Sequence, residues 1–402
     1  MAVLKFEQAR QTVIERVRQS PLQRASEAVA LGESLGRVLA EPVRADRDFP
    51  PFPRSTRDGY AVRAGDLDRL PARLRCVGQV AAGNAFAGVV GTGECVEIMT
   101  GAPLPNGADA VVMVEHTAQQ DEWVEVQRSV KPLENVVPRG SESQQGDLLL
   151  PVGRRLRYAE IATLAAVGCQ TVGVYPKPRV AILSTGDEVV DVGQLPGPFQ
   201  IRNSNSWSLQ AQVSAAQATP VVLGIVPDRE DRLREKIAEG LQADLLLLSG
   251  GVSKGKFDLA EKVLEEFGAE FFFDGVAIRP GHPLVFGRAQ EKFFFGLPGN
   301  PLSAMVTFEL FVRPALALLS GEPDAPLIFL RARLAQDVRP VPGLTAFRPA
   351  LLEGSAYEPV VAPVESKGSG DIASLVRANC YLVVPEEGGE LRAGEWVAVL
   401  VR

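Results

Sequence analysis

The sequence predicts an α/β multidomain protein built around a doubly wound parallel sheet. Residues 178–325 alternate between short apolar segments and amphipathic segments, which is the pattern of repeated strand–helix units. Residues 47–145 and 326–402 instead show short β-forming segments separated by Gly and Pro. The chain has 402 residues, 46% of them hydrophobic and 23% charged. This is a globular composition, long enough for about two or three ordinary domains.

We expect four regions along the chain. Residues 1–46 and 146–177 are predicted to form one discontinuous, largely helical domain with linkers, and residues 47–145 to form a β-rich domain inserted into it. Residues 178–325 form the doubly wound domain, and residues 326–402 form a small C-terminal β domain.

The N-terminal region is predicted to be helical. Phe6, Ala9, Val13 and Val17 recur at near-helical spacing, and a second apolar stretch follows Pro21, from residue 25 to 39. Charge appears too early for a signal peptide, and no uninterrupted apolar run approaches the ~18 residues of a membrane span. We therefore expect a cytoplasmic protein with no membrane partner.

The inserted and doubly wound domains give local element predictions. The segments rich in β-formers in the inserted domain are 74–80, 95–100, 110–115 and 123–126, and a helical pattern returns around 158–167. In the doubly wound domain the predicted strands are 180–183, 221–226, 245–248 and 293–295. The predicted helices there are 207–216, a segment around Leu233–Leu241, a segment from Phe257 to Phe267, and 302–319.

Charge and composition argue against several function classes. A net charge of −7 does not suit a protein that coats nucleic acid. Four cysteines without a CxxC pair and two histidines argue against a zinc site. Neither histidine lies near a nucleophile-elbow motif, so a Ser-His-Asp hydrolase is not expected either. The cysteines are Cys76, Cys95, Cys169 and Cys380, and we expect them to be reduced.

Three polar or Gly-rich segments follow predicted strands of the doubly wound domain: 184–188 (STGDE), 249–255 (SGGVSKG) and 297–303 (LPGNPLS). The carboxyl ends of parallel strands meet at one edge of such a sheet, where ligands bind. Backbone N–H groups in Gly-rich turns and in the first turn of a helix bind phosphates. Each segment is also compatible with an ordinary turn, with Asn300 capping the last helix. Together, three segments at one edge indicate a phosphate-bearing ligand, although none matches a Walker or GxGxxG motif.

Acidic and cationic side chains accompany these loops. Asp187, Glu188 and Asp258 are expected near the same edge, and Asp58 follows a Pro-rich stretch. Carboxylates beside bound phosphates commonly hold Mg²⁺, whereas the alternative is that each acid forms a turn or caps a helix. The stiff turn from Arg279 to Pro283, which includes His282, suits a tetrahedral oxyanion.

Five motifs in this order resemble the molybdopterin molybdenumtransferases, the molybdenum insertase family that includes bacterial MoeA and the gephyrin E domain. The motifs are Asp-Gly-Tyr-Ala-Val (58–62), Met-Thr-Gly-Ala-Pro (99–103), Ser-Thr-Gly-Asp-Glu (184–188), Ser-Gly-Gly-Val-Ser (249–253) and Leu-Pro-Gly-Asn-Pro (297–301). Each motif is weak alone, but five in register over nearly the whole chain are highly specific.

The resemblance implies a fold, an assembly and a reaction. It implies a molybdopterin-binding doubly wound domain, a C-terminal β-barrel and an elongated homodimer. The implied reaction inserts molybdate into adenylylated molybdopterin, with Mg²⁺-dependent release of AMP. An adenylyltransferase that supplies the substrate and maturation proteins of molybdoenzymes are the implied partners.

The resemblance also assigns residues. Catalytic roles fall to Asp58, Glu142, Asp187, Glu188 and Asp258, of which Asp58, Asp187 and Glu188 would bind the metal. Molybdopterin would contact Thr100, Ser184, Thr185, Gly186, Ser249, Gly250, Gly251, Ser253, Gly255, Pro298, Gly299 and Asn300. Molybdate would contact Arg279, His282, Ser303, Arg348 and Ser369.

The chain departs from the family pattern at several of these motifs. His282 stands where the family often has Lys, Glu142 replaces an Asp, Asn203 replaces an Asp, and Lys254 replaces an apolar residue. These departures leave two alternatives to the insertase. One is a pterin-binding carrier or scaffold with impaired turnover. The other is the adenylyltransferase, whose fold resembles residues 178–320.

Overall fold

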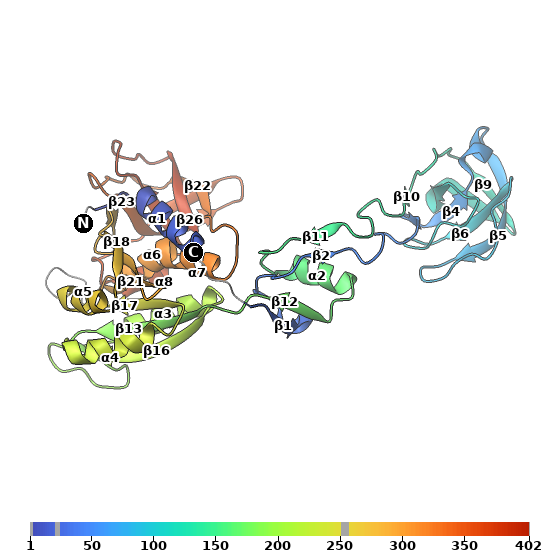
Figure 1. Cartoon of the computed structure of the whole chain (residues 1–402). Coiled ribbons are helices and arrows are strands. Elements are labelled where there is room, and N and C mark those ends of the chain that lie inside the picture. The colour runs from blue at the N-terminus through green and yellow to red at the C-terminus, as the bar shows by residue number, and fades with distance from the viewer. Residues whose placement is uncertain (1–2, 21–24, 251–256, 402) are drawn as a thin grey trace. The chain divides into compact units, whose positions relative to one another are not determined.

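The computed structural model describes residues 3–20, 25–250 and 257–401, and the chain separates into two compact units (Figure 1). Unit 1 comprises Met1–Ala40, Gly153–Arg157 and Val172–Arg402. Unit 2 comprises Glu41–Val152 and Tyr158–Thr171. Each unit has its own buried apolar cores.

The N-terminal segment contains one of the two predicted helices. Helix α1 (Phe6–Arg18) buries the predicted face of Phe6, Ala9, Val13 and Val17. The prediction of a second helix over 25–39 is wrong, because this stretch forms strand β1 (Glu27–Ala30) and a 3₁₀ turn, η1 (Leu31–Glu33). Strand β1 pairs with β12 (Thr171–Val174), and Gly36 adopts a φ of 76°, which ends helical geometry.

The core of unit 1 is a six-stranded sheet in the order β16-β13-β17-β21-β20-β18. The four strands at one side are parallel, whereas β20 runs antiparallel to both β21 and β18. After β13, the next strand of the sheet, β16, lies on one side of β13. The strand after that, β17, lies on the other side, so the direction in which strands are added reverses at β13. The switch point of the sheet therefore lies between β13 and β17. The strands are β13 (Arg179–Thr185), β16 (Thr219–Val226), β17 (Leu245–Ser249), β18 (Glu270–Asp274), β20 (Val285–Ala289) and β21 (Lys292–Leu297).

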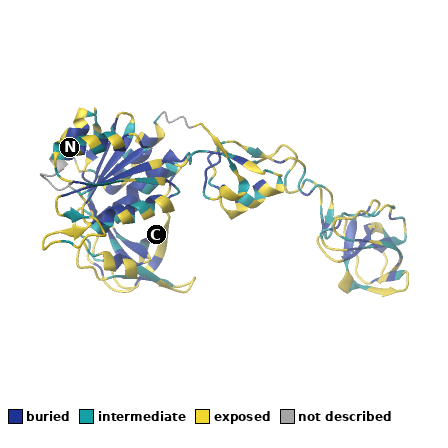
Figure 2. Cartoon of the chain, turned by 90° about the horizontal axis from the view of Figure 1, so that it is seen from below, coloured by how far each residue is buried: buried dark blue, intermediate teal, exposed yellow. Residues whose placement is uncertain are grey.

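Helices cover both faces of this sheet, which confirms the doubly wound prediction. Along β13, Val180 and Ile182 join a core with α3 (Ser204–Ala215) and α7 (Arg313–Leu319). Ala181 and Leu183 project to the opposite core, formed with α4 (Glu230–Gly240) and α5 (Phe257–Glu266). The strands are accordingly buried and the outer helix faces exposed (Figure 2).

A long apolar helical segment follows β21. It consists of α6 (Pro301–Thr307), a π-helical turn (Phe308–Val312) and α7, with Pro314 in the first turn of α7. Within the described residues, Pro301–Leu319 is one segment long and apolar enough to cross a membrane, but 72% of it is buried. This burial is typical of the core helix of a soluble protein.

The C-terminal region forms the closed five-stranded barrel. Its strands are β22 (Phe329–Leu334), β23 (Thr345–Gly354), β24 (Pro359–Pro363), β25 (Cys380–Val384) and β26 (Trp396–Val401). The ring closes because β23 pairs with both β24 and β25. Strand β19 (Ile278–Arg279) pairs in parallel with the start of β23, and helix α8 (Ile372–Arg377) precedes β25.

Unit 2 is β-rich and contains all four strands predicted in the inserted region. Its sheet has the order β7-β4-β6-β5-β9-β8. The strands are β4 (Gly59–Val62), β5 (Ala72–Val80), β6 (Glu94–Ile98), β7 (Ala110–Met113), β8 (Thr117–Gln120) and β9 (Trp123–Val126). The predicted helix around 158–167 is present as α2 (Tyr158–Ala166). Two small two-stranded ribbons also belong to unit 2: β2 (Val43–Arg44) pairs with β11 (Leu148–Leu150), and β3 (Arg54–Ser55) pairs with β10 (Val136–Val137). Two 3₁₀ turns, η2 (Ala64–Leu67) and η3 (Val114–His116), connect its strands.

Candidate functional site

Three loops of unit 1 converge beyond the carboxyl ends of β13, β17 and β21. The register places Ser184 of β13 beside Ser249 of β17, and Ser249 beside Leu297 of β21. A cavity of about 360 Å³ lies there. The lining residues that the sequence predicts are Ser184, Thr185, Glu188, Ser249, Gly250, Pro298, Gly299 and Asn300. The cavity lies at the switch point of the sheet, where open α/β folds bind their ligands.

Glycines allow the loops to approach closely. Gly250 has a φ of 96°, and a Cβ added to it would lie 2.3 Å from the carbonyl oxygen of Thr185. A Cβ on Gly299 would lie 3.5 Å from the Cα of Gly250. At Gly186 an added Cβ would meet the carboxylate of Glu188 at 2.9 Å, so this carboxylate folds back over the loop. A side chain at Gly250 would therefore disrupt this convergence, because the Thr185 carbonyl oxygen belongs to the backbone and cannot rotate away.

Asn203 anchors the first of these loops. Its Oδ1 accepts hydrogen bonds from Ser184 Oγ (3.2 Å) and from the backbone N–H of Ser206 (3.1 Å), and its Nδ2 donates to Ser206 Oγ (2.9 Å). Asn203 is the N-cap residue of α3 and is buried. Asn and Asp cap helices about equally well. The departure from the family Asp therefore preserves the capping function.

This network predicts a loss of stability for Asn203→Ala. The substitution removes the cap of α3 and leaves the Ser184 hydroxyl without its Asn203 acceptor, so we expect it to cost about 1–2 kcal/mol. Calorimetry should show a lower melting temperature for Asn203→Ala. The matched control Asn203→Asp keeps an acceptor at the cap and should lose less. A wild-type melting temperature for Asn203→Ala would contradict this role.

Asn205, which the sequence analysis did not select, connects the other two loops. Its Nδ2 donates to Ser249 Oγ (2.9 Å) and to the carbonyl oxygen of Gly299 (2.8 Å). The side chain is buried and lines the cavity, and its Oδ1 has no hydrogen-bond partner. Asn205 lies in the first turn of α3, a position that strand-end motifs do not point to.

The acidic residues of the site are only partly brought together. Glu188 lines the cavity, and the exposed Asp187 accepts a hydrogen bond from the backbone N–H of Asp228 (3.3 Å). Asp258 lies in the first turn of α5, but its side chain is outside the described part, as are residues Gly251, Ser253, Lys254 and Gly255. Among the residues the structure describes, no three His, Cys, Asp or Glu side chains form a metal-binding group by themselves.

Three predicted residues belong to unit 2. Asp58 Oδ1 accepts hydrogen bonds from the backbone N–H (2.6 Å) and the hydroxyl (2.8 Å) of Thr100. These bonds hold the pKa of Asp58 below its usual value, so the carboxylate stays ionised at a more acidic pH than a free Asp side chain. Glu142 forms an ion pair with Arg54 at 2.9 Å. A longer Glu at position 142 thus still holds a cationic partner.

Two arginines come together where β19 meets β23. The register pairs Arg279 with Ala346, two residues before Arg348. Burial lowers the pKa of the Arg348 guanidinium, and the nearby charge of Arg279 lowers it further. Arg348 also donates a hydrogen bond from Nη2 to the carbonyl oxygen of Arg339 (2.7 Å). Two neighbouring guanidinium groups repel each other, and a bound anion would relieve that repulsion.

Two serines lie around the first turns of α6. Ser303 is buried in α6, and the backbone N–H of its neighbour Leu302 donates to the carbonyl oxygen of Ser369 (3.0 Å). The turn that carries Arg279 also lies close to α6. A Cβ added to Gly281 in this turn would lie only 2.4 Å from Cγ2 of Thr307. In the same turn, His282 donates from Nδ1 to the carbonyl oxygen of Val276 (2.8 Å). Unit 1 therefore holds Arg279 and Arg348 at the junction of β19 and β23, and Ser303 and Ser369 at the start of α6.

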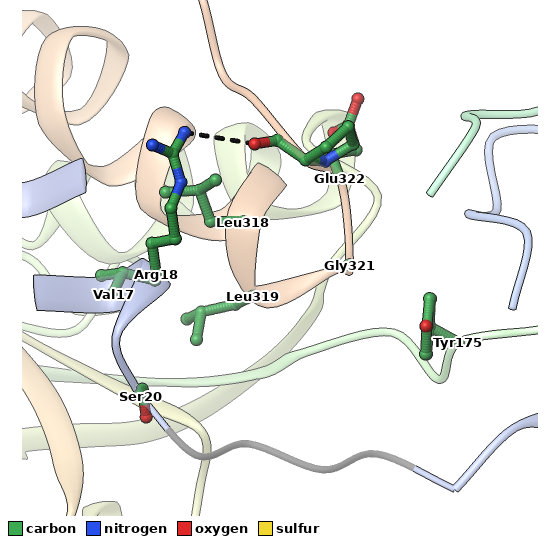
Figure 3. A pocket seen from close by; sticks show the side chains of 9 residues that line it. Val17, Arg18, Ser20, Tyr175, Leu318, Leu319, Gly321 and Glu322 are labelled. Atoms are coloured by element: carbon green, nitrogen blue, oxygen red, sulfur yellow. Dashed lines mark hydrogen bonds between the residues drawn. The ribbon is translucent and has the colours of Figure 1, made fainter. Parts of the chain in front are cut away.

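A second cavity, of about 430 Å³, lies between the end of α1 and the turn after α7 (Figure 3). Two of its polar side chains, Arg18 and Glu322, already have partners. Arg18 donates to the carbonyl oxygen of Pro323 (3.1 Å), and Glu322 accepts from Arg155 (2.6 Å). None of the described residues that line it belongs to the three strand-end loops. The smaller cavity at the switch point is therefore the better candidate site.

Comparison with known proteins agrees with this architecture. Residues 4–168 match the MoeA N-terminal region (domain I and II), residues 181–318 match a probable molybdopterin binding domain, and residues 331–401 match the MoeA C-terminal region (domain IV). The molybdopterin molybdenumtransferase of Bacillus subtilis (strain 168) is 36% identical over 399 residues, covering 96% of this chain and 92% of that protein. The chain belongs to the molybdopterin molybdenumtransferase family.

Further relatives cover the family fold from end to end. The molybdopterin molybdenumtransferase of Haemophilus influenzae is 34% identical and covers 99% of this chain and 98% of that protein. A solved MoeA structure from Pyrococcus horikoshii OT3 aligns over the whole of both chains with a TM-score of 0.85 and 30% identity. The chain is a transferase of molybdenum cofactor biosynthesis, and its activity is the insertion of molybdenum into molybdopterin.

Proposed function

We propose that the substrate is adenylylated molybdopterin and that its phosphates bind at the switch point of unit 1. The observation that carries this proposal is the close approach of Gly250 to Thr185 and of Gly299 to Gly250, beside the N-terminus of α6. Asn300 occupies the N-cap of α6 without a capping hydrogen bond from its side chain, so its amide is available to a ligand. A helix N-terminus and exposed loop N–H groups favour phosphate.

The donor set of the site fits Mg²⁺. This ion keeps several waters and needs only one or two protein carboxylates when substrate phosphates supply the other ligands. Glu188 lies at the cavity and Asp187 is beside it, so these two carboxylates would hold the ion. When bound, Mg²⁺ would neutralise charge on the phosphoanhydride that is cleaved when AMP leaves. From the family resemblance we also propose that Asp58 takes part in metal binding, that the protein forms a homodimer, and that it is located in the cytoplasm.

We further propose that molybdate binds at Arg279 and Arg348, with Ser303, Ser369 and His282 completing the oxyanion site. The guanidinium pair supplies positive charge, and the hydroxyl groups donate hydrogen bonds to oxyanion oxygens. The dithiolene sulfurs of the substrate supply the soft ligands for the metal, which explains why this chain needs no Cys or His cluster of its own.

Arg348→Ala is predicted to weaken molybdate use selectively. Loss of one charge-assisted hydrogen bond costs about 1.5–3 kcal/mol, which corresponds to roughly a 10- to 100-fold higher molybdate requirement. Molybdate titration of cofactor formation measures this, and binding of adenylylated molybdopterin should stay near the wild-type value. The matched control is Arg339→Ala, whose exposed guanidinium pairs with Glu390. Equal loss of pterin affinity in Arg348→Ala would contradict the assignment.

The proposed function is tested by incubating the purified chain with adenylylated molybdopterin, Mg²⁺ and molybdate. We expect AMP release together with active cofactor. Tight pterin binding without AMP release would favour the carrier or scaffold. That alternative is based on the departures from the family pattern at Glu142, Asn203 and His282. ATP consumption with unmodified molybdopterin would instead favour the adenylyltransferase.

A further inference from the structure

Two of the four cysteines are direct neighbours in the sheet of unit 2. In the parallel pairing of β5 and β6, Cys76 lies opposite Cys95. Both side chains contact the same apolar core, so they project from the same face of the sheet. Neighbouring strands lie about 4.8 Å apart, within the Cα separation of about 4.4–6.8 Å that a disulfide requires. Both thiols are free in this structure.

The two thiols differ in exposure. Cys76 is partly exposed, and its Sγ contacts the carbonyl oxygen of Gly78 (3.3 Å). Cys95 is fully buried, and burial together with the Cys76 thiol raises its pKa to about 12. An oxidant from solvent therefore reaches Cys76 first, and Cys95 lies beside it on the neighbouring strand as the partner thiol.

We propose that Cys76 and Cys95 form a reversible disulfide when the protein meets hydrogen peroxide. The Cys76 sulfur attacks one peroxide oxygen, the O–O bond breaks, and water leaves with the thiol proton, which gives a sulfenic acid at Cys76. The Cys95 sulfur then attacks the Cys76 sulfur, the S–O bond breaks, and the Cys95 thiol proton goes to the leaving hydroxide, which departs as a second water. Two thiols lose two electrons and the peroxide gains them. A dithiol reductant reverses the reaction by exchange.

The crosslink would lie on a strand that supports a predicted site residue. Strand β6 runs directly into Met99 and Thr100, and Thr100 holds the carboxylate of Asp58. Strand β6 also pairs with β4 at Ile98 and Gly59, the residue after Asp58. The disulfide would close a short loop between β5 and β6, and we expect it to raise the melting temperature of the oxidised protein.

The test is peptide mapping of the full chain after treatment with hydrogen peroxide. We expect a peptide pair linked through Cys76 and Cys95 that disappears on reduction, and we expect Cys169→Ser to form the same pair. In Cys95→Ser, Cys76 should stop at the sulfenic acid and react with dimedone, a readout that does not depend on the crosslink. Overoxidised Cys76 without a linked partner in the wild type, or a link to Cys169 or Cys380, would overturn the proposal.

Discussion

Glu188→Gln is expected to slow AMP release by about a hundredfold at a fixed Mg²⁺ concentration, because the amide loses the charge that a hard cation requires, at a cost of roughly 3 kcal/mol. The side chains are nearly isosteric, so the fold of the loop over Gly186 should persist. Affinity for adenylylated molybdopterin without Mg²⁺ should remain close to that of the wild type. Single-turnover measurement of AMP at several Mg²⁺ concentrations resolves the effect.

The matched control is Glu235→Gln, an exposed carboxylate on α4 that pairs with Arg232. It removes the same charge from unit 1 without touching the cavity, and its AMP release should equal that of the wild type. If Glu188→Gln released AMP as fast as Glu235→Gln at every Mg²⁺ concentration, the carboxylate at the cavity would have no part in the reaction.

Gly250→Ala is expected to weaken binding of adenylylated molybdopterin by at least about tenfold, because the loop must move out of position. The new Cβ would lie 2.3 Å from the Thr185 carbonyl oxygen. That atom belongs to the backbone, so no side-chain rotation can relieve the collision. Equilibrium titration with the ligand, in the absence of molybdate, measures the loss directly.

Gly224→Ala is the control for backbone strain alone. Gly224 has a φ of 89°, close to that of Gly250, but no atom lies within 4 Å of the position of its Cβ. Both variants should lose stability through the unfavourable φ, and only Gly250→Ala should lose ligand affinity. Equal affinity of the two variants would mean that the loop after β17 does not shape the binding site.

Periodicity predicted strands β13, β17 and β21 of the central sheet well because these strands are buried on both faces. The continuous apolar run of β17 and the face of Leu233 and Ile237 on α4 carry strong signals. Strands β18 and β20, which form the antiparallel side of the sheet, were not predicted. The stretch from 25 to 39 was predicted as a helix from the spacing of its apolar residues alone. This spacing does not show that part of the stretch pairs with strand β12.

The candidate site was predictable where glycine and polar motifs end strands, as at Thr185, Ser249 and Gly299. The parts of the site that depend on contacts between residues far apart in the sequence were not predictable. Asn205 bonds to loops 44 and 94 residues away in sequence, and Cys76 meets Cys95 only through strand pairing. The proximity of Arg279 to Arg348 likewise depends on β19 joining the barrel strand β23. Such contacts depend on topology rather than on local pattern.

A crystal structure of the full chain with adenylylated molybdopterin, prepared without molybdate, tests the central claim most directly. We expect the ligand phosphates to lie against Thr185, Gly250 and Gly299, at the carboxyl ends of β13, β17 and β21. Phosphates bound instead in the cavity beside Arg18 and Tyr175, with the switch point of the sheet filled only by water, would contradict it.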